Sequence, residues 1–136
     1  MVSRWLVKSE PETYAFGDLE RDGAIVWDGV RNYAAALHLK AMKLGDEVFF
    51  YHSGEGKAVV GVSTVSREAF PDASDPAGRF VAVELAAGRA LKRPVTLAQM
   101  KAEPALAGMV MLRQPRLSVS PVSDAEWAAI LKLSGG

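Results

Sequence analysis

The chain has 136 residues, of which 49% are hydrophobic and 24% charged, so we expect one folded domain, residues 1–136, rather than a disordered chain. It carries 16 basic and 16 acidic side chains, which argues against a protein that binds nucleic acid mainly by neutralising many phosphates. The lack of cysteine excludes disulfides, thiolate metal sites and a cysteine nucleophile; with no export signal or membrane-length apolar run, we expect a cytoplasmic protein with no membrane partner.

The N-terminal part of the chain predicts two short strands with a helix between them. Residues 4–8 are rich in β-forming side chains and predict the first strand. An S-x-x-E capping pattern begins at Ser9 and contains a proline, which predicts a helix over residues 10–19. Residues 24–27 predict the second strand.

An amphipathic helix is predicted after the turn at Asp28-Gly29. Apolar residues recur at helical spacing through about Lys43, and Gly45 can end the helix with a positive φ. The residues assigned to the apolar face are Tyr33, Ala35, Leu37, Leu39 and Met42.

The central segment predicts a β-hairpin. Residues 47–52 and 58–65 are rich in aromatic and β-branched side chains, and the SGEG sequence between them is typical of a turn. The PDASDPAG sequence that follows predicts a surface loop, and residues 79–85 predict a further strand.

Two capping boxes predict the last helices. The box at Thr96 opens a short helix that Pro104 interrupts, residues 116–120 predict a strand, and the box at Ser123 opens a terminal helix. Trp127, Ile130 and Leu131 share one face of the terminal helix, which favours packing. The irregular order of strands and helices favours an α+β fold with a small curved or barrel-like sheet over a doubly wound parallel sheet.

The charges are unevenly distributed along the chain. Residues 1–30 hold more acids than bases, whereas residues 89–116 hold a single acid, Glu103. The basic side chains of that second stretch are Arg89, Lys92, Arg93, Lys101, Arg113 and Arg116. We expect either a local basic footprint there or charges that simply solvate a surface.

Enzyme motifs are weak. Ser9, Asp28 and His52 supply the residue types of a hydrolase triad, but no G-x-S-x-G turn accompanies them. His38 and His52 lie on different predicted elements without an acid at ligand spacing, so no metal is predicted. Without a phosphate-binding loop or dinucleotide motif, no cofactor is predicted either.

A binding site is better supported, around the sequence WDGVRNY at residues 27–33. It places two aromatics, an arginine and an amide at one turn, and Tyr14 and Tyr51 also lie at ends of predicted elements. A nucleobase needs aromatic stacking on its faces, and donors and acceptors along its edge. The alternative is that these aromatics are half-buried core residues with satisfied polar tips.

The sequence resembles the EVE domain family over nearly its whole length. The residues that carry the resemblance are KSEP at 8–11 with Tyr14, DL at 18–19, WDGVRNY at 27–33, GD at 45–46, FYHS at 50–53, PD at 71–72 and RLSV with PV at 116–122. The resemblance implies a PUA-like β pseudo-barrel surrounded by short helices, related to YTH and ASCH domains. It also implies a non-catalytic module that binds a flipped, modified base, such as methylated or hydroxymethylated cytosine, in DNA or RNA. The sequence leaves the oligomeric state open, and we favour a monomer.

Carried over residue by residue, the resemblance implies a base-binding pocket. Its residues would be Ser9, Trp27, Asn32, Tyr51, His52 and Ser53, with Lys8, Arg31, Arg113 and Arg116 contacting phosphate or orienting the pocket. Trp27 and Tyr51 would sandwich the base, Asn32 would read its edge, and His52 would contact a polar substituent.

Two other hypotheses stay open. An ASCH-like amidohydrolase acting on a modified nucleoside would use Lys8 with its pKa lowered by burial, together with Glu10. An adaptor with a vestigial pocket would instead bind protein through an apolar surface. The sequence departs from the family pattern at Ala34, Ala36 and Leu37, where members often carry polar residues, which weakens the case for phosphate contact from that helix.

Overall fold

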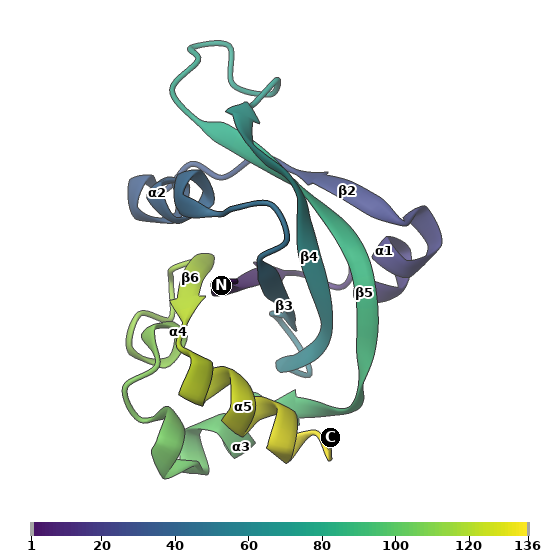
Figure 1. Cartoon of the computed structure of the whole chain (residues 1–136), viewed down its shortest axis with the longest axis vertical. Helices are drawn as coiled ribbons and strands as arrows, with labels where there is room; N and C mark the ends of the chain where they lie inside the picture. Colours follow the sequence, from purple (N-terminus) through teal and green to yellow (C-terminus); the bar gives the residue numbers. More distant parts are fainter. Residues whose placement is uncertain (1, 136) are drawn as a thin grey trace.

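The computed structural model describes residues 2–135, which form one six-stranded mixed sheet with short helices around it (Figure 1). The strand order is β2-β5-β4-β3-β1-β6, with β1 parallel to β3 and the other described pairs antiparallel. The strands are β1 (Arg4–Ser9), β2 (Ala24–Trp27), β3 (Glu47–His52), β4 (Ala58–Pro71), β5 (Val81–Thr96) and β6 (Val119–Val122). This confirms the α+β prediction and the predicted hairpin.

Helix α1 lies beside β2, and the other helices gather at two ends of the sheet (Figure 1). In Figure 1, α2 lies at one end, below the loop that joins β4 to β5, and α3, α4 and α5 lie together at the other. Their bounds are α1 (Phe16–Asp22), α2 (Tyr33–Ala41), α3 (Leu97–Ala102), the 3₁₀ helix η1 (Pro104–Leu106), α4 (Val110–Arg113) and α5 (Asp124–Leu133). The capping boxes predicted at Thr96 and Ser123 are confirmed, since each side chain accepts from the backbone N–H three residues on.

β4 and β5 are long because they bend. Their pairing shifts register at four places, from Val59/Gly61 to Arg67/Phe70, and such bulges increase the local bend and twist. The bend lets one pair of strands border two separate hydrophobic clusters. The predicted strands 58–65 and 79–85 were therefore too short, because the strands continue through charged and glycine residues that the bulges accommodate.

Alternate residues of β3 face the two clusters. Val48 and Phe50 belong to the first core cluster, with α1, α2 and β2, whereas Phe49 and Tyr51 belong to the second, with α3, α5 and η1. In the second cluster the Phe49 and Trp127 rings stack at 3.7 Å, which confirms the predicted packing role of the terminal helix.

The helix predicted from residue 10 is wrong in its start. Ser9 ends β1, opposite His52, and its Oγ donates to the Tyr14 carbonyl at 2.6 Å instead of capping a helix. A turn follows, and α1 begins at Phe16, where the Asp18 carboxylate accepts from the Ala15 N–H at 2.9 Å. The strand pairing of Ser9 overrides its local capping pattern.

The predicted apolar face of α2 is partly wrong. Tyr33 and Leu37 are 66% and 63% exposed, while Ala35 and Leu39 are buried together with Ala36. The buried stripe is thus displaced around the helix and uses small residues where it approaches the sheet. The helix ends at Ala41 rather than near Gly45, and β6 begins at Val119 rather than residue 116.

Candidate nucleic-acid interface

The WDGVRNY turn is fixed to the loop after β4 by one buried carboxylate. Asp72, whose side chain is 0% exposed, accepts from the Gly29 N–H at 2.8 Å and from Arg31 Nη1 at 3.0 Å. Ser74 donates to it through its backbone N–H and its hydroxyl, at 2.7 and 2.6 Å. Gly29 has φ +75°, a conformation that favours glycine, so the turn presents its N–H to the carboxylate without strain.

The ionisation state of Asp72 explains how it holds the turn and the loop after β4 together. Burial alone would raise the pKa of Asp72, but the hydrogen bonds from Ser74, Gly29 and Arg31 hold that pKa well below its usual range. The carboxylate therefore stays charged at neutral pH. Arg31 also bonds Ser74 and lies over the Phe80 ring at 5.3 Å, so its guanidinium holds the turn in place.

Asn32 begins α2 at the end of the same turn. Its Oδ1 accepts from the Ala35 N–H at 3.0 Å, which caps the helix. Within the described residues, its Nδ2 group makes no hydrogen bond. One end of the amide is therefore structural, and the other is free to donate to a ligand.

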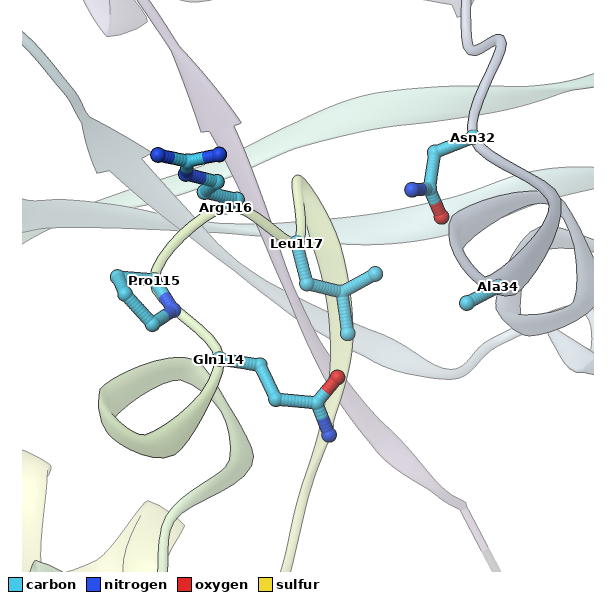
Figure 2. A pocket seen from close by; sticks show the side chains of 6 residues that line it. All are labelled: Asn32, Ala34, Gln114, Pro115, Arg116 and Leu117. Atoms are coloured by element: carbon cyan, nitrogen blue, oxygen red, sulfur yellow. The ribbon is translucent and has the colours of Figure 1, made fainter.

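A shallow depression of about 380 Å³ lies between the start of α2 and the segment before β6. Figure 2 shows Asn32 and Ala34 on one side of it and the segment 114–117 on the other, with the Arg116 guanidinium turned away from Asn32. We call it the amide depression; its lining residues are Asn32, Ala34, Gln114, Pro115, Arg116 and Leu117. It offers amide donors and acceptors together with a single cation.

Trp27 does not lie opposite Tyr51, and it is not among the residues that line the amide depression. Its ring meets Phe50 edge-on at 5.6 Å and shares the first core cluster with Leu117. Tyr51 is buried in the second cluster, on the other face of β3. The predicted sandwich of a base between Trp27 and Tyr51 is therefore wrong, because the two rings lie on opposite sides of one strand.

Ser9 and His52 hold the start of α1. His52 Nε2 accepts from the Phe16 N–H at 3.0 Å, next to the bond from Ser9 to Tyr14. Burial lowers the pKa of His52, which favours the neutral ring that can accept this bond. Each of these side chains thus makes a hydrogen bond to the backbone ahead of α1.

A second, more enclosed pocket of about 220 Å³ shares Pro115 with the amide depression. We call it the lysine pocket; it is lined by Lys8, Tyr51, Ser53, Lys57, Leu97, Lys101, Met111, Leu112 and Pro115. Lys8 Nζ donates to the Pro115 carbonyl at 2.7 Å and lies 5.8 Å from the centre of the Tyr51 ring. Burial, and secondarily the charge of Lys57, lower the pKa of Lys8.

The structure thus divides the predicted site. Asn32 and Arg116 line the amide depression, and Lys8, Tyr51 and Ser53 line the lysine pocket. Arg113 is exposed at the end of α4, where Nη1 donates to the Ala107 carbonyl at 3.4 Å, and lines neither site. The stretch 89–116 does not form one footprint, since Arg89 and Lys92 border a separate hollow beside α5.

The amidohydrolase hypothesis requires Lys8 and Glu10 to act together, whereas a metal site requires several ligands and a membrane-spanning helix requires a long apolar segment. No ion pair joins Lys8 to Glu10 in the described chain, and Glu10 is exposed. Across residues 2–135, no group of three or more histidine or acidic side chains could hold a metal ion. None of the helices described is long and apolar enough to cross a membrane.

Several residues that line or support the two sites were not among the predicted site residues. Asp72 carried a signal, since its PD dipeptide belongs to the resemblance, and Leu117 lies within the RLSV motif. Gln114, Lys57 and Lys101 carried none, because only the tertiary fold brings them to these sites.

Comparison with known families and proteins identifies relatives along almost the whole chain. The EVE domain family model matches residues 3–133. The chain is 34% identical to human thymocyte nuclear protein 1 over 167 residues, which cover 98% of this chain and 74% of that protein.

Solved structures share the fold. Rpa0253 from Rhodopseudomonas palustris is 48% identical with a TM-score of 0.94, covering 98% of this chain and 94% of that one. Human THYN1 in complex with 5-methylcytosine-containing DNA is 32% identical with a TM-score of 0.94, covering 98% of both chains. An ASCH protein from Zymomonas mobilis, 14% identical with a TM-score of 0.61, shares the fold alone, which agrees with the predicted PUA-like architecture.

Proposed function

The chain belongs to the EVE domain family, and from that premise we propose that it is a non-catalytic module that binds nucleic acid and reads a modified base at the amide depression. The observation that carries the proposal is the depression itself, in a chain that is 32% identical to human THYN1, a protein solved in complex with 5-methylcytosine-containing DNA. Within such a nucleic acid, the amide depression suits the base rather than the phosphate backbone.

The chemistry of the depression supports base reading. The Nδ2 group of Asn32 can donate to the edge of a base, and the amide of Gln114 can donate to it or accept from it. The side chain of Leu117 offers an apolar contact for a methyl group. A base reaches such a site only when it is out of the stack, so the proposal includes a flipped or single-stranded nucleotide.

Trp27 is the stacking face in this proposal. Its indole is partly exposed at the end of β2 and shares a hydrophobic cluster with Leu117, which lines the depression. Stacking on an aromatic side chain contributes about 1–3 kcal/mol per base. Ser9 and His52 support the loop behind it instead of contacting the base.

Discrimination of a methyl group should be modest. One methyl in an apolar pocket changes affinity by about 1–3 kcal/mol. The balanced total charge and the single cation in the depression also predict weak, sequence-independent binding to the backbone. DNA and RNA, single-stranded and duplex, therefore have to be compared directly.

The test is a titration with oligonucleotides that carry cytosine, 5-methylcytosine or 5-hydroxymethylcytosine at one position. Asn32→Ser retains a good helix cap and removes the amide, so it should lower the preference for the modified base while the chain stays folded. Trp27→Ala should weaken binding to all three. Lys40→Gln, an exposed change on the helix that Asn32 caps, is the control for a substitution away from the depression. Equal affinity for the three bases in the unaltered chain, in both DNA and RNA, would contradict the proposal.

A further inference from the structure

The lysine pocket gathers positive charge from distant parts of the chain. Lys8 lies in β1, Lys57 just before β4, and Lys101 in α3, and all three line the same 220 Å³ cavity. None of the pocket's lining residues, all of them within the described part of the chain, is acidic. The lining therefore carries three basic groups and no acidic one, although the net charge of the chain is zero.

The charges in this pocket are not fully compensated. Lys8 is partly buried, and the charge of Lys57 is close enough to oppose its protonation. The carbonyl of Pro115 accepts from Lys8 Nζ, but a carbonyl carries no net charge to offset two ammonium groups. An anion placed between these lysines would remove the repulsion and gain charge-assisted hydrogen bonds.

The rest of the pocket is apolar. The Tyr51 ring lies beneath Lys8, and side chains of Leu97, Met111 and Leu112 complete the lining. Ser53 adds one hydroxyl. Inorganic phosphate alone would leave the apolar part of this lining uncovered, whereas a phosphate ester with a flat organic body would cover it.

From this combination, we infer that the lysine pocket binds a nucleotide, with the phosphate held by Lys8, Lys57 and Lys101 and the organic part packed against the apolar lining. The nucleotide is either a neighbour of the modified base in a bound strand or a free mononucleotide. The inference goes beyond the proposed function, because the pocket and the amide depression share only Pro115 among their lining residues.

The position of Pro115 makes a continuous strand feasible. Both sites are lined by Pro115, so a strand that passes over this residue would place one nucleotide at each. A free mononucleotide needs no such path. The two sources thus share one recognition chemistry and differ in whether the lysine pocket binds without a strand.

The experiment uses the full chain and the variants Lys57→Gln, Lys101→Gln and the double variant, with Lys40→Gln as the matched control. Binding of inorganic phosphate, cytidine monophosphate and the cytosine and 5-methylcytosine oligonucleotides is measured by calorimetry at two salt concentrations. Each pocket substitution should weaken binding about fivefold to tenfold, as for the loss of one charge-assisted hydrogen bond, and Lys40→Gln should change it little.

The outcomes separate the sources. Binding of cytidine monophosphate that the double variant loses supports a free-nucleotide site. Without mononucleotide binding, a loss of oligonucleotide affinity in the double variant, equal for cytosine and 5-methylcytosine and with a smaller salt dependence, supports the strand. Unchanged binding of all probes in the double variant overturns the inference. A chain that binds phosphate through these lysines but does not prefer a modified base contradicts the proposed function alone.

Discussion

The amide depression and the lysine pocket share Pro115 in their linings, yet they are built by different means. The depression is open, holds one cation, and takes its amide from a turn that a buried carboxylate fixes in place. The pocket is more enclosed, holds three lysines, and leaves two of them in repulsion. The first arrangement suits the edge of a neutral ring, and the second suits a charged group.

The geometry of strand β3 explains why residues of the FYHS motif, at 50–53, lie in separate parts of the structure. Phe50 supports Trp27 in the first cluster, Tyr51 faces the lysine pocket, and His52 holds the start of α1. Because side chains alternate between the faces of a strand, neighbours in the sequence are placed on opposite sides of the sheet. Polar and aromatic residues that are adjacent in a strand motif therefore do not by themselves form one pocket.

The largest difference between the two sites should come from Asp72→Ala. This change removes the acceptor for the Gly29 N–H, Arg31 and Ser74, and should lower the free energy of unfolding by about 3 kcal/mol. Under conditions in which the Asp72→Ala variant is still folded, its preference for a modified base should fall while its binding of cytidine monophosphate persists. Urea unfolding and both titrations check this. Asp28→Ala, at an exposed acid of the same turn, is the control, and an equal loss there would contradict the role of Asp72.

The next largest effect should come from Gly61→Ala, on the side of the first core cluster. A methyl group at Gly61 would collide with the ring of Phe16, which is buried. Overpacking of this kind costs about 1–3 kcal/mol, and it should displace the start of α1 and lengthen the bond from Phe16 to His52. Unfolding measurements and the histidine NMR signals would report both effects.

Gly17→Ala is the matched control for that change. Gly17 lies in α1 with no atom near the added methyl group, and alanine favours a helix by up to about 1 kcal/mol. We expect this variant to be as stable as the unaltered chain or more so. If Gly61→Ala were equally harmless, Phe16 would not be tightly packed against β4.

The sequence predicted those features of the fold that depend on local patterns. Strands β1, β2 and β3 follow from β-forming runs, and the caps at Thr96 and Ser123 follow from three-residue spacing. The pattern at Ser9 failed because its strand pairing with His52 outweighs the capping preference of the residue. The lengths of β4 and β5 failed because bulges let strands continue through residues that normally end them.

The site was predicted in part. Asn32 and Arg116 line the amide depression. Both residues were named as candidates because they lie in the WDGVRNY and RLSV motifs that carry the family resemblance. The lysine pocket was outside the reach of sequence patterns, since Lys57 and Lys101 have no motif around them. Lys57 comes near Lys8 through the pairing of β1 with β3 and of β3 with β4, and Lys101 through the position of α3. Long-range packing also decides which of the two hydrophobic clusters each aromatic side chain of a strand enters. Local sequence patterns do not reveal this choice.

A smaller effect, specific to the lysine pocket, is a dependence of anion affinity on pH. Lys8 is faced by Tyr51, Lys57 and Lys101, and burial raises the pKa of Tyr51, so the phenol stays neutral. Because the pKa of Lys8 is lowered, its charge and the anion affinity should decline at a lower pH than for an ordinary lysine. Removal of the charge of Lys57 should move this decline to higher pH.

Calorimetry with cytidine monophosphate across the alkaline range, on the unaltered chain and on Lys57→Gln, measures the shift. A purely structural role of Lys57 would lower affinity without moving the pH profile. An identical midpoint in both proteins would therefore argue against repulsion between Lys57 and Lys8. The base preference measured at the amide depression should not follow this profile, because Lys8 does not line it.

The smallest effect should arise at His52, which borders neither site. Its folded pKa lies below the ordinary value of 6.5 because of burial, so its contribution to stability is present above that value and is lost as pH falls through the folded pKa. Protonation would place a hydrogen on Nε2, which now accepts from Phe16 N–H, and cost about 1 kcal/mol. His38 shifts in the same direction, also through burial, so urea unfolding at pH 7.5 and 5 is compared in His38→Gln with and without His52→Gln. A pH dependence that survives in the double variant would assign the effect to carboxylates instead.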